Sequence, residues 1–168
     1  MVASTDLPPA ATAVGISLDQ QLCLALYTAS RAMTARYRVA LSRVGLTYPQ
    51  YLVMLLLWEE GSCSVGGIGH RLSLDSSTLS PLLKRLQAMG LVTRTRAATD
   101  ERLMIIGVTP RGAELESEAA QVAAEMGAAT GQTPEEYHEL TEQLRALTVR
   151  LEASTAEAVA RGPEPRVS

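Results

Sequence analysis

SVGGIGHRLSLDSSTLSPLLKRLQAMG, from Ser64 to Gly90, predicts two short helices separated by a turn at residues 73–75. Asp75 is a typical N-cap for the second helix, because its carboxylate can accept hydrogen bonds from the backbone N–H groups of the first turn. Apolar residues recur along one face of this helix, at Leu79, Leu82, Leu86 and Met89. The other face offers small hydroxyls and then basic groups, which suits an anionic partner: Ser76, Ser77, Thr78, Ser80, Lys84 and Arg85.

The flanking segments predict a buried helix before this stretch and a hairpin after it. LTYPQYLVMLLLWEEG, residues 46–61, is apolar on all sides, with Thr47 as N-cap, Pro49 in the first turn and Gly61 as the stop. LVTRTR and LMIIGVT predict two strands, with AATDE as the turn between them. This order is that of a winged helix-turn-helix, whose second short helix enters the DNA major groove. The hairpin is then a wing whose arginines reach the DNA backbone or a narrow minor groove: Arg94, Arg96 and Arg102.

Long helices are predicted at both ends of the chain. Residues 17–45 show apolar spacings of three and four, with Ser17 and Gln20 as a capping box and Gly45 as the stop. Residues 111–160 predict a helix after Pro110 and a last helix capped by Thr133. The fold class is mainly α with a small β-hairpin wing, in one domain over residues 17–160. The helices of 17–45 and 111–160 are predicted to dimerise, 47–109 to form the winged helix-turn-helix, and 1–16 and 161–168 to be disordered tails.

Composition narrows the class of protein. Hydrophobic residues make up 46% of the chain, charged residues 20%, and no apolar run approaches the roughly 18 residues of a membrane span. The first 16 residues lack the pattern of a secretory signal, so we expect a cytoplasmic protein with reduced thiols and no membrane partner. The net charge is −3, yet residues 61–110 carry six basic and three acidic groups while residues 111–160 carry three basic and ten acidic. The basic centre favours a segment that faces an anion.

Resemblance to a known family rests on three stretches: LTYPQYLVMLLLWEE, LSLDSSTLSPLLKRLQAMGLVTRTR and TDERLMIIGVT. They closely resemble MarR-type winged-helix repressors, in particular the branch that senses organic hydroperoxides, usually called OhrR. The resemblance is strong from Leu18 to Thr109 and general beyond Pro110. It implies a homodimer on a pseudo-palindromic double-stranded DNA operator, in which Arg102 probes the minor groove and Asp100 holds the wing in shape. The glycines of VGGIGHRL depart from the family pattern and predict a soft first short helix.

Cys23, Tyr27 and Tyr37 lie on the first predicted helix. Tyr27 is one turn from Cys23, whereas fourteen residues separate Cys23 from Tyr37 by about 21 Å along the axis. Only a second copy of the helix, as in a twofold dimer, can bring Tyr37 to the sulfur. The resemblance implies the same arrangement, with Cys23 as the peroxide-reactive residue, hydrogen-bonded by the tyrosines of the partner subunit that match Tyr27 and Tyr37.

The predicted chemistry requires a thiolate, which phenol hydroxyls stabilise by donating hydrogen bonds to it. Attack on a peroxide gives a sulfenic acid, which condenses with a thiol or oxidises further. We expect this change to move the dimer to a geometry that no longer fits DNA. No cofactor or metal is needed, and His70 and His138 show no ligand spacing. The neighbouring leucines favour bulky organic hydroperoxides: Leu22, Leu24 and Leu26.

Cys63 is expected in a loop and is a weak candidate for a resolving thiol. Some members of the family form an intersubunit disulfide through a second cysteine after the wing, but residues 110–168 contain no cysteine. The chain therefore resembles the one-cysteine type, which completes its response with a low-molecular-weight thiol or by overoxidation.

Three other functions stay open from the sequence. One is a MarR-type repressor induced by a small aromatic or anionic ligand, with Cys23 in a packing role. Another is a thiol peroxidase, although the resemblance favours a protein that is not an enzyme. The last is a helical dimer with a purely structural role, in which Cys23 is an inert small hydrophobe.

Overall fold

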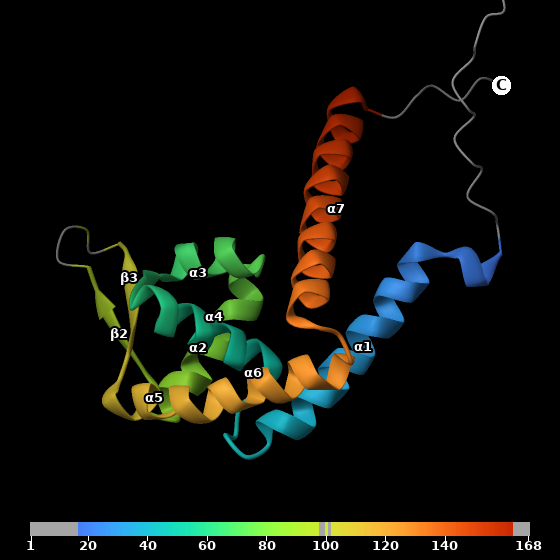
Figure 1. Cartoon of the computed structure of the whole chain (residues 1–168). Coiled ribbons are helices and arrows are strands. Elements are labelled where there is room, and N and C mark those ends of the chain that lie inside the picture. The colour runs from blue at the N-terminus through green and yellow to red at the C-terminus, as the bar shows by residue number, and fades with distance from the viewer. Residues whose placement is uncertain (1–16, 98–99, 101, 163–168) are drawn as a thin grey trace, which may run out of the picture. The chain divides into compact units, whose positions relative to one another are not determined.

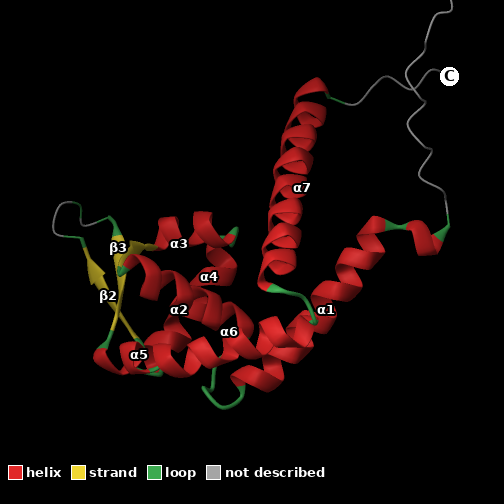
Figure 2. Cartoon of the chain, in the orientation of Figure 1, coloured by secondary structure: helices red, strands yellow, loops and turns green. Residues whose placement is uncertain are grey.

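The computed structural model describes residues 17–97, 100 and 102–162, so the predicted tail 1–16 and residues 163–168 of the predicted tail 161–168 lie outside the described residues. Two compact units divide the chain, one ending at Val122 and the other beginning at Ala123. The first unit contains the helices before the wing, in this order: η1 (Leu18–Gln20), α1 (Leu22–Leu41), α2 (Tyr48–Glu60), α3 (Val65–Leu72) and α4 (Ser76–Ala88). Figures 1 and 2 show these helices followed by the strands of the wing.

The first long helix starts later than the sequence predicts. Ser17 caps only the short 3-10 turn η1, and its side chain makes no capping hydrogen bond, so the predicted Ser17–Gln20 capping box is wrong. Gln21 is extended, with φ −80° and ψ 106°, and this interrupts the helix before α1 begins at Leu22. The helix ends at Leu41, and Gly45, with φ +69°, completes the turn that follows it.

The buried helix α2 forms as predicted. Thr47 is its N-cap, and the backbone N–H of Thr47 donates to Oε1 of Gln50 at 2.8 Å, which gives this buried amide a partner. Gly61, with φ +80°, ends the helix. Most of the side chains that point inward from α2 are nearly inaccessible to solvent: Tyr51, Val53, Met54, Leu56 and Leu57. The helix supplies much of the core on which α3, α4 and the strands of the wing rest.

The glycines of α3 allow a tight junction with α4. Ser64 caps α3 by accepting a hydrogen bond from the N–H of Gly67 at 3.0 Å. At the other end, the N–H of Leu74 donates to the carbonyl of Gly69 at 2.9 Å. A Cβ on Gly69 would lie 2.9 Å from the carbonyl oxygen of Leu74, closer than real Cβ contacts. At this position glycine permits the chain to fold back closely into the next helix.

The wing is a three-stranded antiparallel sheet rather than a lone hairpin. The predicted pair is present as β2 (Val92–Arg96) and β3 (Met104–Val108), but β3 also pairs with β1 (Ser62–Ser64), giving the order β1-β3-β2. Cys63 therefore lies in a strand opposite Ile106, not in the expected loop. A three-residue strand is too short to show the alternation from which strands are predicted. Of the predicted turn AATDE, residues 98, 99 and 101 are outside the described residues.

Thr109 joins the end of the wing to the next helix. Its hydroxyl donates to the carbonyl of Gly90 at 2.7 Å and accepts from the N–H of Gly112 at 3.0 Å. A Cβ on Gly112 would lie 2.2 Å from the carbonyl oxygen of Leu91, so only glycine fits there. The helix expected after Pro110 is broken at Leu115 into α5 (Pro110–Glu114) and α6 (Glu116–Thr130).

The second unit contains the end of α6 and the helix α7 (Pro134–Arg161). Thr133 and Glu136 form a reciprocal capping box at its start, as the sequence predicts for Thr133. Arg161, assigned in the prediction to a disordered tail, is the last residue of this helix. Several large apolar side chains of α7 are exposed in the single chain: Tyr137, Leu140, Leu144, Val149, Leu151 and Val159. Among the described residues, no helix combines the length and apolarity needed to cross a membrane.

Candidate nucleic-acid interface and thiol site

Asp75 organises the N-terminus of α4. Its carboxylate accepts hydrogen bonds from the N–H of Thr78 at 2.8 Å, from the hydroxyl of Thr78 at 3.0 Å and from the hydroxyl of Ser77. The hydroxyl of Ser77 and then the N–H of Thr78 hold the pKa of Asp75 down, at about 2. In this arrangement the hydroxyl protons of Ser77 and Thr78 are used within the cap. A phosphate oxygen can only accept hydrogen bonds, so it has to displace the Asp75 carboxylate before it can accept from these two hydroxyls.

The other contact residues predicted on α4 lie mostly on its exposed side. Ser76, Lys84 and Arg85 are exposed, and Ser80 is half-buried. The opposite face packs inward through Leu79, Leu82, Leu83 and Leu86, whereas Met89, predicted to face inward, is half-buried. Leu83 is fully buried but was not among the residues predicted to face inward. The apolar stripe predicted from helix periodicity was narrower than the face that the structure buries. Pro81 lies within α4 without ending it.

In the wing, Arg96 and Arg102 are exposed and Arg94 is half-buried. Arg94 and Arg96 are two residues apart on β2, so their side chains leave the same face of the sheet. Arg102 follows the turn, and its N–H donates to Oδ1 of Asp100 at 2.9 Å. The N–H of Leu103 donates to the carbonyl of Asp100 at 3.0 Å. Asp100 therefore makes both side-chain and backbone contacts that shape the wing beside Arg102.

The three residues of the predicted thiol site occupy different surroundings on α1. Cys23 is an exposed free thiol, and Tyr27, one turn on, is 59% exposed. Tyr37 is half-buried against α2, with its ring centroid 4.5 Å from that of Tyr48 and 5.9 Å from that of Tyr51. Within one chain, Tyr27 thus lies one helical turn from Cys23, whereas Tyr37 lies about 21 Å from Cys23 along the helix axis.

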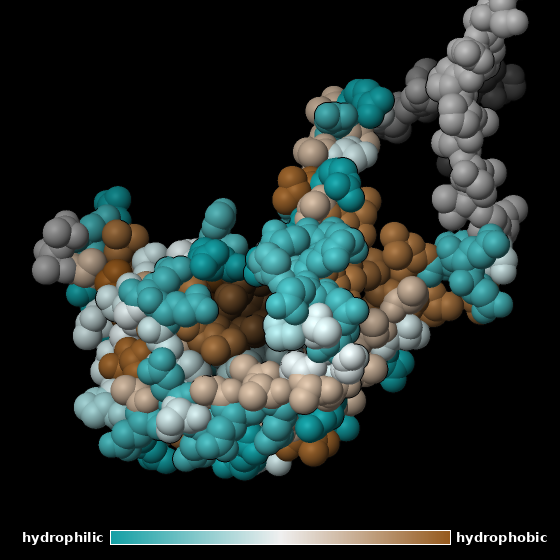
Figure 3. Space-filling view, in the orientation of Figure 1, coloured by the Kyte–Doolittle hydropathy of each residue, from teal (hydrophilic) through white to brown (hydrophobic). Residues whose placement is uncertain are grey.

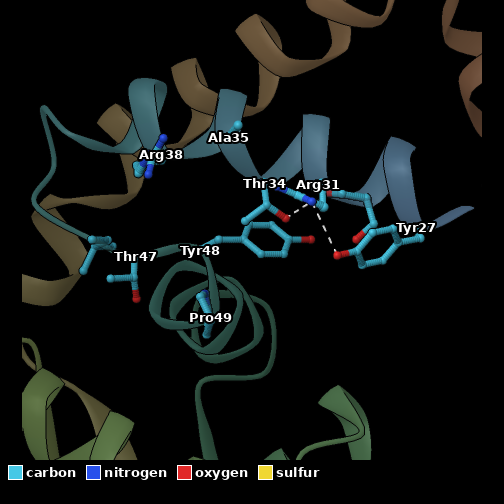
Figure 4. Close-up of a pocket in the computed structure, with 10 residues that line it drawn as sticks. Tyr27, Arg31, Thr34, Ala35, Arg38, Thr47, Tyr48 and Pro49 are labelled. Carbon is cyan, nitrogen blue, oxygen red and sulfur yellow. Dashed lines mark hydrogen bonds between the residues drawn. The ribbon is translucent and has the colours of Figure 1, made fainter.

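A cavity of about 560 Å³ lies between α1 and the start of α2. Figure 4 shows Tyr27, Arg31, Thr34 and Arg38 on α1 facing Tyr48 and its neighbours on α2. Of these residues, the sequence predicts Tyr27 for the thiol site and Tyr48 as core or pocket lining, and it does not predict a role for Arg31, Thr34 or Arg38. An apolar-periodic helix gives no signal for a cavity that a second helix closes, although the sequence shows arginines at positions 31 and 38 of that helix, with a third at position 36.

Cys63 is held in a hydrogen-bonded group away from α1. Its thiol donates to Oε2 of Glu60 at 3.4 Å, and Oε1 of Glu60 is paired with Nε of Arg71 at 3.0 Å. Burial and then the hydrogen bond to Glu60 raise the pKa of the Cys63 thiol, while the charge of Arg71 opposes them. A thiol with a raised pKa is a poor nucleophile at neutral pH. Across the described part of the chain, no three histidine, cysteine, aspartate or glutamate side chains gather as a metal site would require.

Comparison with known proteins identifies the family. The family model described as transcriptional regulator SarA/Rot matches residues 36–119. The organic hydroperoxide resistance transcriptional regulator of Bacillus subtilis is 41% identical over 132 residues, which are 79% of this chain and 90% of that protein. The HTH-type transcriptional regulator TtmR of Methylorubrum extorquens is 47% identical, over 82% of this chain and 70% of that protein. The chain belongs to the MarR-type winged-helix transcriptional regulators.

Solved structures of MarR-type regulators agree with this fold. AbfR of Staphylococcus epidermidis matches with a TM-score of 0.68 and 36% identity, over 80% of this chain and 94% of that one. Reduced AbfR bound to DNA matches with a TM-score of 0.67, 35% identity and the same coverage. The predicted fold class is confirmed, and this MarR-type chain is a DNA-binding transcriptional regulator rather than an enzyme.

Proposed function

We propose that this regulator is a homodimeric repressor that senses organic hydroperoxides through Cys23 and then releases a pseudo-palindromic operator. The observation that carries the proposal is the exposed Cys23 thiol with the exposed Tyr27 one turn away on α1. The 41% identity to an organic hydroperoxide resistance regulator supports the same chemistry. The protein would act in the cytoplasm, where the operator DNA lies.

A dimer accounts for the surroundings of the thiol. Large apolar side chains lie exposed near Cys23 in the sequence, namely Leu18 in η1 and Leu22 at the start of α1, and Figure 3 shows an apolar surface along this part of the chain. A second copy of the chain would cover this surface and bring its own Tyr27 and Tyr37 to the sulfur. The hydroxyls would then donate to Cys23 and favour its thiolate.

The reaction is a two-electron oxidation of sulfur. The Cys23 thiolate attacks the terminal oxygen of the hydroperoxide, an S–O bond forms, the O–O bond breaks, and the alkoxide leaves and takes a proton to become the alcohol. The sulfur becomes a sulfenic acid while the peroxide is reduced. A low-molecular-weight thiol then condenses with the sulfenic acid, which gives a mixed disulfide and water. Neither the sulfenic acid nor the mixed disulfide has the charged sulfur with which the thiolate accepts the tyrosine hydrogen bonds.

DNA recognition would place α4 of each subunit in the major groove, about 34 Å from its twin. Lys84 and Arg85 would neutralise phosphates, and Ser76 and Ser80 would add polar contacts beside Ser77 and Thr78. The wing would lie along the neighbouring minor groove, with Arg94, Arg96 and Arg102 toward the DNA and Asp100 supporting it.

A mobility shift assay with DNA from promoter regions tests the proposal. Cumene hydroperoxide with a small thiol should abolish the shift of the wild-type protein and of Cys63→Ser, and should leave that of Cys23→Ser intact. Wild-type binding that survives the peroxide would contradict hydroperoxide sensing and leave the assignment as a DNA-binding regulator in place.

The cavity beside Tyr27 favours a second candidate function, in which a small aromatic or anionic ligand induces release. Arg31 and Arg38 line it together with Tyr48, so it offers both positive charge and an aromatic wall. Under this alternative, salicylate or benzoate would weaken DNA binding equally in wild type and Cys23→Ser. Full peroxide response with no effect of either acid would exclude it.

A further inference from the structure

Arg31 contacts Tyr27 in two ways. Its Cζ lies 5.6 Å from the centroid of the Tyr27 ring, so the guanidinium charge lies over the aromatic face. Its Nη1 lies 3.5 Å from the Tyr27 hydroxyl oxygen, to which it donates (Figure 4). The two residues are four apart on α1, which is the spacing at which helix side chains meet. Arg31 therefore fixes the position of a side chain that is otherwise largely exposed.

The contact with Arg31 determines which further hydrogen bonds the Tyr27 hydroxyl can make. A phenol hydroxyl has one proton to donate and lone pairs with which it accepts, whereas guanidinium only donates. With Arg31 donating to the oxygen, the Tyr27 proton is left for a different acceptor. A thiolate is an acceptor without a proton of its own, so a tyrosine held in this way matches the charged form of a cysteine. The guanidinium also adds positive charge on the same side of the ring.

We propose that Arg31 is a positioning residue of the peroxide-sensing site: it orients the Tyr27 hydroxyl so that this hydroxyl donates to the Cys23 thiolate of the partner subunit. The proposal rests on the proposed hydroperoxide-sensing function and adds to it a residue that touches neither the sulfur nor the peroxide. Arg38 provides a matched control, because it is exposed on the same helix and lines the same cavity, about 10 Å further along the axis.

The test compares the pH profile of Cys23 alkylation by iodoacetamide in the dimeric protein, on a Cys63→Ser background. Arg31→Gln should move the midpoint of the profile to higher pH and slow oxidation by cumene hydroperoxide roughly threefold to tenfold, as expected for one weakened hydrogen bond. Arg31→Lys, which keeps the charge, should recover part of the rate. Arg38→Gln should change neither. Thermal unfolding and DNA affinity of the reduced protein should be unchanged in all three variants, which separates positioning from a general structural role.

A double-mutant cycle with Tyr27→Phe makes the test specific. If Arg31 acts through the Tyr27 hydroxyl, Arg31→Gln should cause no further slowing once that hydroxyl is removed. Equal slowing in both backgrounds, or a wild-type pH profile in Arg31→Gln, would overturn the proposal while hydroperoxide-triggered DNA release in the wild-type protein still upheld the proposed function. A wild-type protein that keeps its DNA in hydroperoxide would contradict the proposed function and with it this role of Arg31.

Discussion

The ring of Tyr37 on α1 lies 4.5 Å from the ring of Tyr48 at the start of α2, inclined to it by 38°. Tyr37 thus joins the helix that carries Cys23 to the buried support helix of the DNA-binding unit. Under the proposed function its hydroxyl also contacts the sulfur of the partner subunit, so one side chain would link oxidation to the position of α2. The ring of Tyr37 would then serve the packing against α2, and its hydroxyl would serve the reaction at the sulfur.

Tyr37→Phe separates these two parts. The substitution keeps the ring against Tyr48 and removes the hydroxyl, so we expect little change in thermal stability and a roughly tenfold slower reaction of Cys23 with organic hydroperoxide, from the loss of a hydrogen bond to a charged acceptor. Tyr37→Leu should in addition destabilise the fold by about 1 kcal/mol through loss of the aromatic pair. Stopped-flow oxidation and thermal unfolding measure the two effects. An unchanged oxidation rate in Tyr37→Phe would place Tyr37 in packing alone.

Lys84 and Arg85 provide a test of the DNA-facing surface. Each is exposed on α4, and each phosphate contact that is lost should reduce the slope of log K against log salt by about 0.9. Fluorescence anisotropy at several salt concentrations should therefore show weaker and less salt-dependent binding in Lys84→Ala and Arg85→Ala. Arg150→Ala, which removes an exposed charge from α7, is the control and should leave the slope unchanged. Equal slopes in all the variants would argue against α4 as the DNA-reading helix.

Two glycines of α3 should respond to alanine in opposite directions. A Cβ on Gly66 meets nothing within 4 Å, whereas one on Gly69 would lie 2.9 Å from the carbonyl oxygen of Leu74. Because alanine favours helix, Gly66→Ala should stabilise the protein by about 0.5 to 1 kcal/mol. Gly69→Ala should destabilise it by about 1 to 3 kcal/mol, since the α3–α4 junction has to move. Chemical denaturation measures both, and a stabilising Gly69→Ala would show that the close approach is not needed.

Cys63 should be slow to react and should depend on its two charged neighbours in opposite ways. Burial and then Glu60 raise the pKa of the Cys63 thiol, and Arg71 opposes them, so the thiolate fraction at pH 7 is smaller than that of an ordinary cysteine. On a Cys23→Ser background, Glu60→Gln should speed alkylation of Cys63 and Arg71→Gln should slow it, with the pH midpoint shifting down and up respectively. Fast, pH-independent labelling of Cys63 in the parent protein would contradict this account and restore it as a resolving thiol.

The DNA-binding half of the fold was predictable because its signals are local. Asp75 as N-cap, the apolar body of α2 and the two strands β2 and β3 each lie within one short segment, and the structure confirms each of them. The errors occur where a nonlocal contact or a backbone detail decides. Strand β1 has only three residues and forms by pairing with the edge of β3, which is distant from it in the sequence. The helix α1 begins at Leu22 because Gln21 is extended.

The candidate site was less predictable than the DNA-binding half, because its geometry depends on contacts between residues far apart in the sequence. The spacing of Cys23, Tyr27 and Tyr37 could be read from the sequence, but the ring contact between Tyr37 and Tyr48 joins residues in two different helices. The use of the Ser77 hydroxyl within the Asp75 cap is likewise a matter of geometry rather than residue type. Arg31 was passed over because an arginine on a helix surface is ordinarily a solvated charge.

The most direct test of hydroperoxide sensing is a titration of the operator complex with cumene hydroperoxide, from zero to two equivalents per subunit, with free cysteine as the small thiol. Anisotropy follows the DNA and intact mass follows the protein. We predict that release is complete near one equivalent and tracks a cysteine adduct or added oxygen on Cys23, and that Cys23→Ser keeps its DNA throughout. Full adduct formation on Cys23 with the DNA still bound, or release without any change in mass, would contradict the account.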